Sequence, residues 1–448
     1  ASALESSLEF PNTCKKKNNS KKKPSPQAYN ISAAMSTTPK NTTPSQTPLK
    51  FILSGGGTGG HIFPAVAIAN ALKVKFPGAQ FLFVGAIGKM EMEKVPKEGF
   101  EILGLPIEGL KRSASPRNII VLLKTIQSFW KARKILRNFQ PTAVIGTGGY
   151  ASLPVCFMAS RMGYTTILQE QNGFAGLTNR LVASRAALIC TGFPSMEKFF
   201  PAGNWEFTGN PVRQNIINLG KKLNSVNKLD SAGELNSTHE LDSENAACRQ
   251  KFGLQPNLPV LFITGGSLGA RTINQTIFNN LVQLAEANIQ IVWQMGLPFA
   301  KSHADKIHQI IESNPALFLA PNAPRIFHAP FIYDMDDAYQ AADLVVSRAG
   351  AISISEIAVV GKPSILVPSP NVTDDHQTKN AQVLSELNAA MLITDKDAPQ
   401  TLINTCIELI KDTKKMSEMQ EKLKQIAKPQ ATETIANRIA SLIEKANP

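Results

Sequence analysis

The chain of 448 residues is too long for one ordinary domain, and its 43% hydrophobic and 18% charged residues exclude a disordered protein. The net charge of +13 admits anionic partners, but residues 1–50 hold eight lysines against two glutamates, and residues 111–137 hold eight Lys and Arg and no acid. Because the rest of the chain is nearly neutral and carries no nucleic-acid reading motif, we expect no nucleic-acid partner.

Residues 1–48 are rich in Lys, Ser, Thr, Asn and Pro without apolar periodicity, which predicts a disordered tail. From residue 49 on, short apolar strands alternate with helical stretches, a pattern typical of a parallel sheet covered by helices. The strands expected in this first domain, 49–210, are Lys50–Ser54, Gln80–Val84, Ala143–Gly146, Thr166–Gln169 and Ala187–Thr191.

A second domain is expected over residues 211–448. A polar segment at about 220–248 is interpreted as a surface insertion, and the helical spacing of Lys415–Ala446 predicts helices that close this domain. Its predicted strands are Val260–Thr264, Ile289–Gln294, Ile326–Pro330, Leu344–Ser347 and Ser364–Val367. The chain is therefore expected to be α/β, with two doubly wound domains.

Glycine clusters follow three of these strands, at Gly55–Gly60, Gly146–Gly149 and Gly265–Gly269. Glycine lets backbone N–H groups approach a ligand, and a following helix N-terminus favours negative charge. Tight packing turns could account for any one cluster, but three at the carboxyl ends of parallel strands predict a ligand cleft between two Rossmann-like domains. The second strand leads into Gly85 instead of an acidic residue, which disfavours a nicotinamide cofactor, and no cofactor is expected.

Small residues after Leu344–Ser347 open a helix whose N-terminus suits a diphosphate. Glu356 lies about one turn inside that helix, where its carboxylate either accepts both hydroxyls of a ribose or relieves the helix dipole. His376 and Gln377 follow a proline-terminated strand and are placed to contact sugar hydroxyls.

Taken in order, these motifs closely resemble those of the MurG family, bacterial N-acetylglucosaminyltransferases of peptidoglycan synthesis. The resemblance runs from about Leu49 to the C-terminus, and only the tail and the polar insertion lie outside it. It is carried by Gly55–His61, Gly146–Tyr150, Gln169–Gly173, Gly209–Arg213, Gly265–Ala270, Arg348–Glu356 and His376–Gln377.

The resemblance implies a GT-B fold, in which two Rossmann-like domains face each other across a cleft, the first binding the acceptor and the second UDP-GlcNAc. The implied reaction moves GlcNAc, with inversion, to the C4 hydroxyl of MurNAc in undecaprenyl-diphospho-MurNAc-pentapeptide (lipid I), giving lipid II. The residues implied to bind UDP-GlcNAc are Thr58, Gly59, Gly60, Asn172, Arg213, Ser267, Ile332, Ala351, Ile352, Ser353, Glu356 and Gln377, with His376 as a further sugar contact.

Such a displacement needs a base for the hydroxyl proton and stabilisation of the departing UDP. His61 is the first candidate base, because it follows the first glycine cluster and imidazole titrates near neutral pH. A structural histidine that caps its helix is the alternative interpretation. Glu170 is the second candidate base.

Two Asp-x-Asp patterns, Asp334-Met-Asp336 and Asp395-Lys-Asp397, formally match a motif with which other glycosyltransferases hold a metal. The first opens a helical stretch, where acids favour the helix dipole, and the second lies in a turn. We therefore expect no essential metal in the active site. Helix N-termini and Arg213 would stabilise the diphosphate instead.

A basic helix is predicted over residues 117–137, with Ile119, Leu123, Ile126 and Trp130 on one face. Such helices bind anionic membrane surfaces, although this apolar face could equally pack on the sheet. The surface expected to contact the acceptor and the membrane consists of Lys111, Arg112, Arg117, Gly148, Gly149 and Tyr150.

No apolar run is long enough to span a bilayer, and five widely spaced cysteines without a C-x-x-C pair fit a reducing compartment. We expect a peripheral protein on the cytoplasmic face of the bacterial inner membrane, with cell-wall synthesis proteins as partners. Two other classes stay open. A UDP-GlcNAc 2-epimerase would share the fold without needing a lipid-facing patch, and a non-catalytic nucleotide-sugar-binding protein would tolerate loss of the base.

Overall fold

The computed structural model describes residues 48–109, 117–200, 203–225, 236–266, 268–372 and 375–446. Residues 48–448 form one compact unit. The tail expected over residues 1–48 lies outside the described residues, except for Pro48. Within the part of the chain that the structure describes, no helix combines the length and the apolar character needed to cross a bilayer.

The first sheet has seven parallel strands in the order β3-β2-β1-β4-β5-β6-β7. Its central strand β1 pairs with β2 on one side and with β4 on the other, so that Phe51 lies beside Phe81 and Ala143. The strands are β1 (Lys50–Gly55), β2 (Gln80–Ala86), β3 (Glu101–Leu105), β4 (Ala143–Gly148), β5 (Thr165–Glu170), β6 (Leu188–Thr191) and β7 (Trp205–Phe207).

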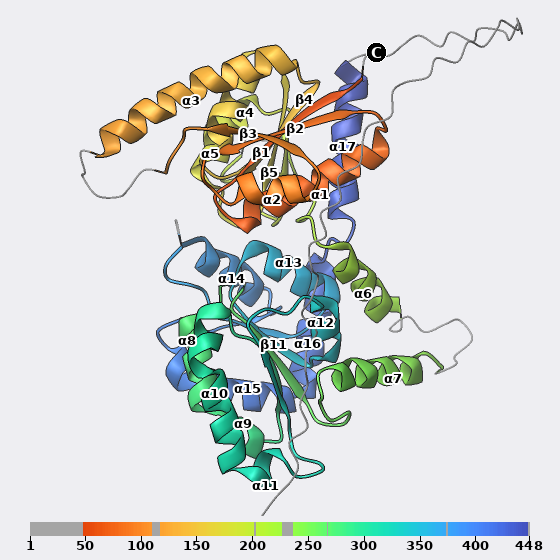
Figure 1. The fold of residues 1–448 in the computed structure, drawn as a ribbon. Helices are drawn as coiled ribbons and strands as arrows, with labels where there is room; N and C mark the ends of the chain where they lie inside the picture. Colours follow the sequence, from red (N-terminus) through yellow and green to blue (C-terminus); the bar gives the residue numbers. More distant parts are fainter. Residues whose placement is uncertain are drawn as a thin grey trace, which may run out of the picture. The chain divides into compact units, whose positions relative to one another are not determined.

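Helices cover both faces of this sheet because alternate side chains of each strand point to opposite sides. Ile52 packs in one core with α3, α4 and α5, while Phe51 and Leu53 pack in another with α1 and α17 (Figure 1). The helices are α1 (Gly59–Lys75), α2 (Glu91–Lys97), α3 (Arg117–Phe139), α4 (Ser152–Arg161), α5 (Leu177–Val182), a 3-10 turn (Ala183–Arg185) and α17 (Ala431–Ala446).

The second sheet has six parallel strands in the order β10-β9-β8-β11-β12-β13. The same alternation divides its core: Phe262 packs with α6, α12 and α13, and Ile263 packs with α8, α9, α10 and α15. The strands are β8 (Val260–Thr264), β9 (Gln290–Gln294), β10 (Ile326–Ala329), β11 (Leu344–Ser347), β12 (Ser364–Leu366) and β13 (Met391–Leu392).

The helices of this second part include two, α6 and α7, that flank residues outside the description. The helices are α6 (Gln214–Ser225), α7 (Asn236–Lys251), α8 (Arg271–Asn279), α9 (Leu281–Glu286), α10 (Leu297–Ser313), α11 (Pro315–Phe318), α12 (Met335–Ala341), α13 (Ala351–Val360), α14 (His376–Glu386), α15 (Ala398–Lys411) and α16 (Thr413–Ile426).

The predicted α/β class with two doubly wound sheets is confirmed, and all ten predicted strands are present with ends shifted by at most two residues. Three strands were not predicted: β3, β7 and β13, all toward the sheet edges. The segment expected as a polar insertion at 220–248 is helical where it is described, since α6 ends at Ser225 and α7 begins at Asn236.

The C-terminal end of the chain differs from the expectation. The helical stretch expected over Lys415–Ala446 is divided into α16 and α17, and the second of these belongs to the first sheet's core. Helix α17 buries Ile435, Ile439 and Ile443 against Ile62 of α1. The last helix of the domain expected over 211–448 therefore packs with the first sheet. Apolar spacing predicts a helix but does not say which sheet it covers.

Candidate active site

Two glycine-rich loops of the first sheet pack against each other. One joins β1 to α1, and the other follows β4. Gly149 has a φ of +80°, and a Cβ atom on it would lie 2.3 Å from the carbonyl oxygen of Gly56. Only glycine permits both the conformation and the close approach. The two loops therefore form one fixed surface at the carboxyl end of β1 and β4.

The N-terminus of α1 is exposed at this surface. Thr58 is its N-cap residue, and its carbonyl oxygen accepts hydrogen bonds from the backbone N–H of His61 and Ile62 at 3.1 and 3.2 Å. Thr58 and Gly60 are exposed and Gly59 is partly exposed, so these three expected ligand residues can be reached from solvent. A helix N-terminus in this position favours an anionic or oxygen-rich ligand.

His61 lies in the first turn of α1 with its ring held from one side. Nδ1 lies 2.9 Å from the carbonyl oxygen of Thr147 and 3.0 Å from Oε1 of Gln171. Both neighbours are acceptors, since the Gln171 amide nitrogen donates to Thr147 O at 2.7 Å. Nδ1 must therefore carry the hydrogen, which leaves the lone pair on Nε2. A general base needs this tautomer. The ring bonds to Thr147 and Gln171 and does not cap its own helix.

Glu170, the second candidate base, is buried at 2% exposure and occupied by hydrogen bonds. Its Oε1 accepts from the N–H of Asn172 at 3.0 Å, and its Oε2 accepts from the N–H of Gly176 and from Asn179 Nδ2, both at 2.9 Å. A carboxylate with these partners organises the loop after β5 and has little capacity left for a substrate proton. The geometry favours His61 as the base.

A buried carboxylate that the sequence analysis missed also lies at the first glycine loop. Glu91 opens α2, is fully buried, and accepts hydrogen bonds from the N–H groups of Gly57 and Ala86, both at 3.0 Å. Acidic residues in the first turn of a helix are ordinarily solvated and interact favourably with the helix dipole. A glutamate at this position therefore does not predict a contact with a distant loop. In the sequence, only Gly85 pointed to this contact, because its missing side chain leaves room for Glu91.

On the second sheet, two expected donor ligands contact each other. Arg213 donates to Glu356 with two parallel hydrogen bonds, Nε to Oε1 at 2.7 Å and Nη2 to Oε2 at 2.9 Å. Burial lowers the pKa of Arg213, but the hydrogen bond and the charge of Glu356 outweigh it and raise the pKa overall. Glu356 is buried in α13, and Arg213 holds its carboxylate in place. It is therefore not an unpaired acid that only relieves the helix dipole.

The first turn of α13 holds Ala351, Ile352 and Ser353, after Gly350 as N-cap. The segment before it is tied to the loop after β5 by Asn380, a fully buried residue of α14. Asn380 Nδ2 donates to Ala349 O and to Asn172 Oδ1, both at 3.2 Å, and its Oδ1 accepts from Gly173 N at 2.8 Å. The expected ligand Asn172 is thus brought beside the α13 N-terminus.

Ile332, expected to hold a base through its backbone, is buried, and its N–H donates to Gln294 Oε1 at 3.0 Å. The amide nitrogen of Gln294 bonds in turn to Thr264 Oγ1 at 3.2 Å and to Gly266 O at 3.1 Å. Sequence reasoning missed Gln294, which ends a buried strand and looks like core. Ser267, the next expected ligand, lies outside the described residues.

His376 and Gln377 open α14 and are both partly exposed. Gln377 Oε1 accepts a hydrogen bond from the N–H of Ser369 at 2.9 Å. The amide nitrogen of Gln377 takes no part in this bond and can donate to another group. The structure therefore places both residues at the end of the loop after β12, and their contact with a sugar stays a prediction.

Of the expected acceptor surface, Gly148, Gly149 and Tyr150 belong to the second glycine loop. Tyr150 lies against the first loop, where a Cβ on Gly57 would be 3.3 Å from its Cε1. Burial, and after it the charges of Glu91 and Glu108, raise the pKa of the Tyr150 hydroxyl. Lys111 and Arg112 lie outside the described residues, and Arg117 is the first residue of α3.

The apolar side chains of α3 divide between two faces. Leu136 lies in the core of the first sheet and Val121 is buried, whereas Leu123, Ile126 and Trp130 are 62%, 49% and 71% exposed. The alternative that the predicted apolar face packs on the sheet is therefore wrong for these three residues. Ile119 lies outside the side chains that are described.

Each of the two Asp-x-Asp patterns has an aspartate that contacts a side chain far away in the sequence. Asp336 accepts from Asn215 Nδ2 at 2.8 Å, and Asp395 pairs with Arg348 at 2.5 Å. Among the described residues, no group of three or more His, Cys, Asp or Glu is arranged to hold a metal ion.

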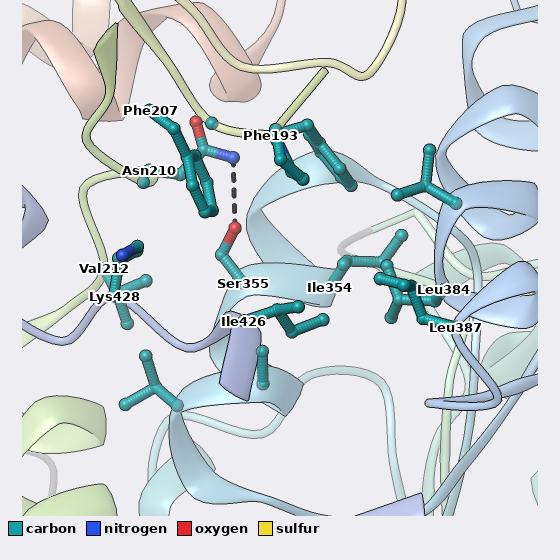
Figure 2. A pocket seen from close by; sticks show the side chains of 16 residues that line it. Phe193, Phe207, Asn210, Val212, Ile354, Ser355, Leu384, Leu387, Ile426 and Lys428 are labelled. Carbon is teal, nitrogen blue, oxygen red and sulfur yellow. Dashed lines mark hydrogen bonds between the residues drawn. The ribbon is translucent and has the colours of Figure 1, made fainter. Parts of the chain in front are cut away.

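A separate, mostly apolar pocket lies beside the segment that joins the two sheets. Asn210 donates to Ser355 Oγ at 3.0 Å across it, and Phe193, Phe207 and Leu384 form part of its walls (Figure 2). None of the expected substrate-binding residues that are described lines this pocket, so it is not the predicted nucleotide site.

Comparison with known families matches both parts of the chain. The glycosyltransferase family 28 N-terminal domain matches residues 51–191, and the glycosyltransferase family 28 C-terminal domain matches residues 260–435. A protein of Cytophaga hutchinsonii is 45% identical over 400 residues, which cover 89% of this chain and 98% of that protein. It is named UDP-N-acetylglucosamine--N-acetylmuramyl-(pentapeptide) pyrophosphoryl-undecaprenol N-acetylglucosamine transferase.

Solved structures give the same fold. The crystal structure of Acinetobacter baumannii MurG superposes with a TM-score of 0.65 and 27% identity, covering 89% of this chain and all of that one. A UDP-GlcNAc 2-epimerase from Neisseria meningitidis superposes with a TM-score of 0.56 over 88% of this chain and all of that one, at 14% identity. At that identity the likeness to the epimerase concerns the fold alone.

Proposed function

The chain belongs to glycosyltransferase family 28, and on that basis we propose that it transfers GlcNAc from UDP-GlcNAc to the C4 hydroxyl of MurNAc in lipid I. The product is lipid II, the precursor used for peptidoglycan synthesis. The observation that carries this proposal is the match to the Cytophaga hutchinsonii transferase over 98% of that protein's length. The geometry of the site supports the proposed roles of particular residues, given below.

The proposed donor site lies on the second sheet. The N–H groups in the first turn of α13, at Ala351, Ile352 and Ser353, are suited to the diphosphate, because a helix N-terminus favours negative charge. Arg213 adds a positive charge beside them, and Glu356 accepts ribose hydroxyls. The proposed remaining contacts are Ile332 with the uracil, Gln377 and His376 with the sugar, and Asn172, Ser267, Thr58, Gly59 and Gly60 along the site.

His61 is the proposed general base. As the acceptor oxygen attacks the anomeric carbon, its proton moves to Nε2, the C1–O4 bond forms, and the bond from C1 to the UDP oxygen breaks. Attack from the face opposite UDP inverts the anomeric centre. The diphosphate leaves with its negative charge facing Arg213 and the α13 N-terminus, so no metal is required in this proposal.

The acceptor carries a lipid, and the exposed apolar stripe of α3 supplies a surface for it. Leu123, Ile126 and Trp130 are exposed, and Lys131 and Lys134 on the same helix are exposed cations. Trp and Leu insert at a membrane interface while Lys favours anionic headgroups. We place the protein peripherally on the cytoplasmic face of the bacterial inner membrane, where Lys111, Arg112, Arg117, Gly148, Gly149 and Tyr150 would face the acceptor and cell-wall synthesis proteins would be its partners.

The proposal is tested by incubating the purified chain with UDP-GlcNAc and a lipid I analogue and following UDP release together with the disaccharide product. Release that depends on the acceptor, and that persists in the presence of a chelator, is the expected result. UDP release or conversion of UDP-GlcNAc that is the same with and without the acceptor would contradict transfer and favour epimerase-like chemistry.

A further inference from the structure

Glu91 is a buried carboxylate whose two oxygens are both committed to backbone groups of the first domain. Oε2 accepts from the N–H of Gly57 and Oε1 from the N–H of Ala86, each at 3.0 Å, and no part of the residue is exposed. A charged acceptor makes such hydrogen bonds strong, and removing it leaves buried donors unsatisfied. Because it is fully buried, Glu91 cannot touch a substrate.

The space for this carboxylate exists because two neighbouring residues lack side chains. A Cβ atom on Gly56 would lie 2.2 Å from Glu91 Oε1, and one on Gly85 would lie 2.5 Å from Glu91 Cγ. Gly56, just after β1, and Gly85, in β2, thus form a slot that fits the glutamate side chain. The arrangement is specific to this carboxylate and is more than a general feature of the helix start.

The hydrogen bond between Glu91 and Gly57 is linked to His61 by the backbone of residues 57–61. Gly57 has a φ of +88°, and the next residue, Thr58, caps α1 by accepting from the N–H of His61 at 3.1 Å. From this position, Nδ1 of His61 hydrogen-bonds to Thr147 O at 2.9 Å and to Gln171 Oε1 at 3.0 Å. A loop that changed its path at Gly57 would move the start of α1 and take the imidazole away from these partners.

We propose that Glu91 is a positioning residue for the transfer reaction: it fixes the peptide at Gly57 so that Nε2 of His61 is held toward the acceptor hydroxyl. This inference rests on the proposed function, because it takes His61 as the base. Arg213 and Glu356, the residues proposed to hold the diphosphate and ribose, bond to each other, whereas Glu91 bonds to the backbone of the first domain. Loss of Glu91 should therefore lower turnover more than it weakens donor binding, since Arg213 and Glu356 are retained and only the proposed contacts of Thr58, Gly59 and Gly60 are disturbed.

The test compares Glu91→Gln with Glu93→Gln in the full chain. Glu93 lies on the same helix, is exposed, and pairs with Lys97, so its variant removes the same charge without touching the loop. Glutamine at 91 keeps the shape but presents its NH2 group to one of the two N–H donors. We expect kcat to fall by about tenfold or more, because a misplaced base costs orders of magnitude in rate. The KM for UDP-GlcNAc should rise by much less than kcat falls, since the contacts of Arg213 and Glu356 are retained and only those of Thr58, Gly59 and Gly60 are disturbed.

A second measurement does not depend on catalysis. Hydrogen exchange of the peptide covering residues 56–60, followed by mass spectrometry, should be faster in Glu91→Gln and unchanged in Glu93→Gln. If Glu91→Gln fails to fold, Glu91→Asp carries the same test, because it keeps the charge but is one methylene too short to reach both donors.

Wild-type turnover in Glu91→Gln, or a loss of turnover with unchanged exchange in residues 56–60, would overturn the inference. So would faster exchange across the whole first sheet together with a rise in the donor KM as large as the fall in kcat, which would show general destabilisation. Failure of the wild-type chain to transfer GlcNAc would instead overturn the proposed function. The two failures are therefore distinguishable.

Discussion

Arg213 and Glu356, 143 residues apart in the chain, form a two-pronged ion pair with N–O distances of 2.7 and 2.9 Å. The Glu356 side chain is 6% exposed and the Arg213 side chain 47% exposed. Arg213 therefore orients Glu356 from one side while keeping part of its own surface open. Because each carboxylate oxygen has a second lone pair, Glu356 can still accept ribose hydroxyls without breaking the pair.

From this pair we predict that Arg213→Ala weakens UDP-GlcNAc binding by about tenfold or more and lowers the free energy of unfolding by about 1–3 kcal/mol. The variant removes the positive charge beside the diphosphate and leaves a buried carboxylate without its partner. Titration calorimetry and urea denaturation measure the two effects. Arg180→Ala, at an exposed position of α5, is the control and should change neither quantity. Unchanged donor affinity in Arg213→Ala would remove Arg213 from the proposed site.

His61→Ala should reduce the rate of transfer by about 10²–10⁴, the usual contribution of a positioned general base. Donor affinity should stay as in the wild type, because the residues proposed to hold UDP do not include His61. Single-turnover kinetics together with equilibrium binding of UDP-GlcNAc separates the two quantities. Equal losses in both would mean that the histidine serves binding or structure instead of proton transfer.

Glu170→Gln separates the two candidate bases. An amide at this position offers one acceptor oxygen where the carboxylate now accepts from Asn172, Gly176 and Asn179. The free energy of unfolding should fall by about 1–3 kcal/mol through the unsatisfied donors of this loop. Thermal and urea unfolding check this. A variant with wild-type stability that is inactive in transfer would make Glu170, and not His61, the base.

The central strands of both sheets could be predicted from sequence because they are continuous apolar runs, several of which lead into glycine, as in Phe51–Leu53 before Gly55. The edge strands β3 and β13 could not be predicted, because β3, Glu101–Leu105, mixes a charge and a glycine with its apolar residues, and β13 has only two residues. Short strands of this kind are defined by their neighbours in the sheet and not by their own pattern.

The candidate site shows the same division. His61 and Glu356 could be singled out because each follows a strand and a run of small residues. The ion pair of Glu356 with Arg213 and the contact of Glu91 with Gly57 join residues far apart in the chain, and spacing in one sequence carries no information about such contacts. The choice between His61 and Glu170 likewise depended on hydrogen-bond partners, which only the fold brings together.

The exposed stripe of α3 leads to a prediction about membranes. Leu123→Ser and Trp130→Ser each remove an apolar side chain that is 62% or 71% exposed, so the folded state loses little packing. Burying such a side chain in an interface is worth about 1.5–3 kcal/mol, which is about tenfold or more in the partition coefficient. Sedimentation with vesicles that contain an anionic phospholipid should therefore show about tenfold weaker binding for either variant. Val74→Ser is the matched control, since Val74 is 82% exposed on α1, away from this helix, and its loss should leave partitioning unchanged. Equal binding by the wild type and both α3 variants would mean that another surface meets the lipid acceptor.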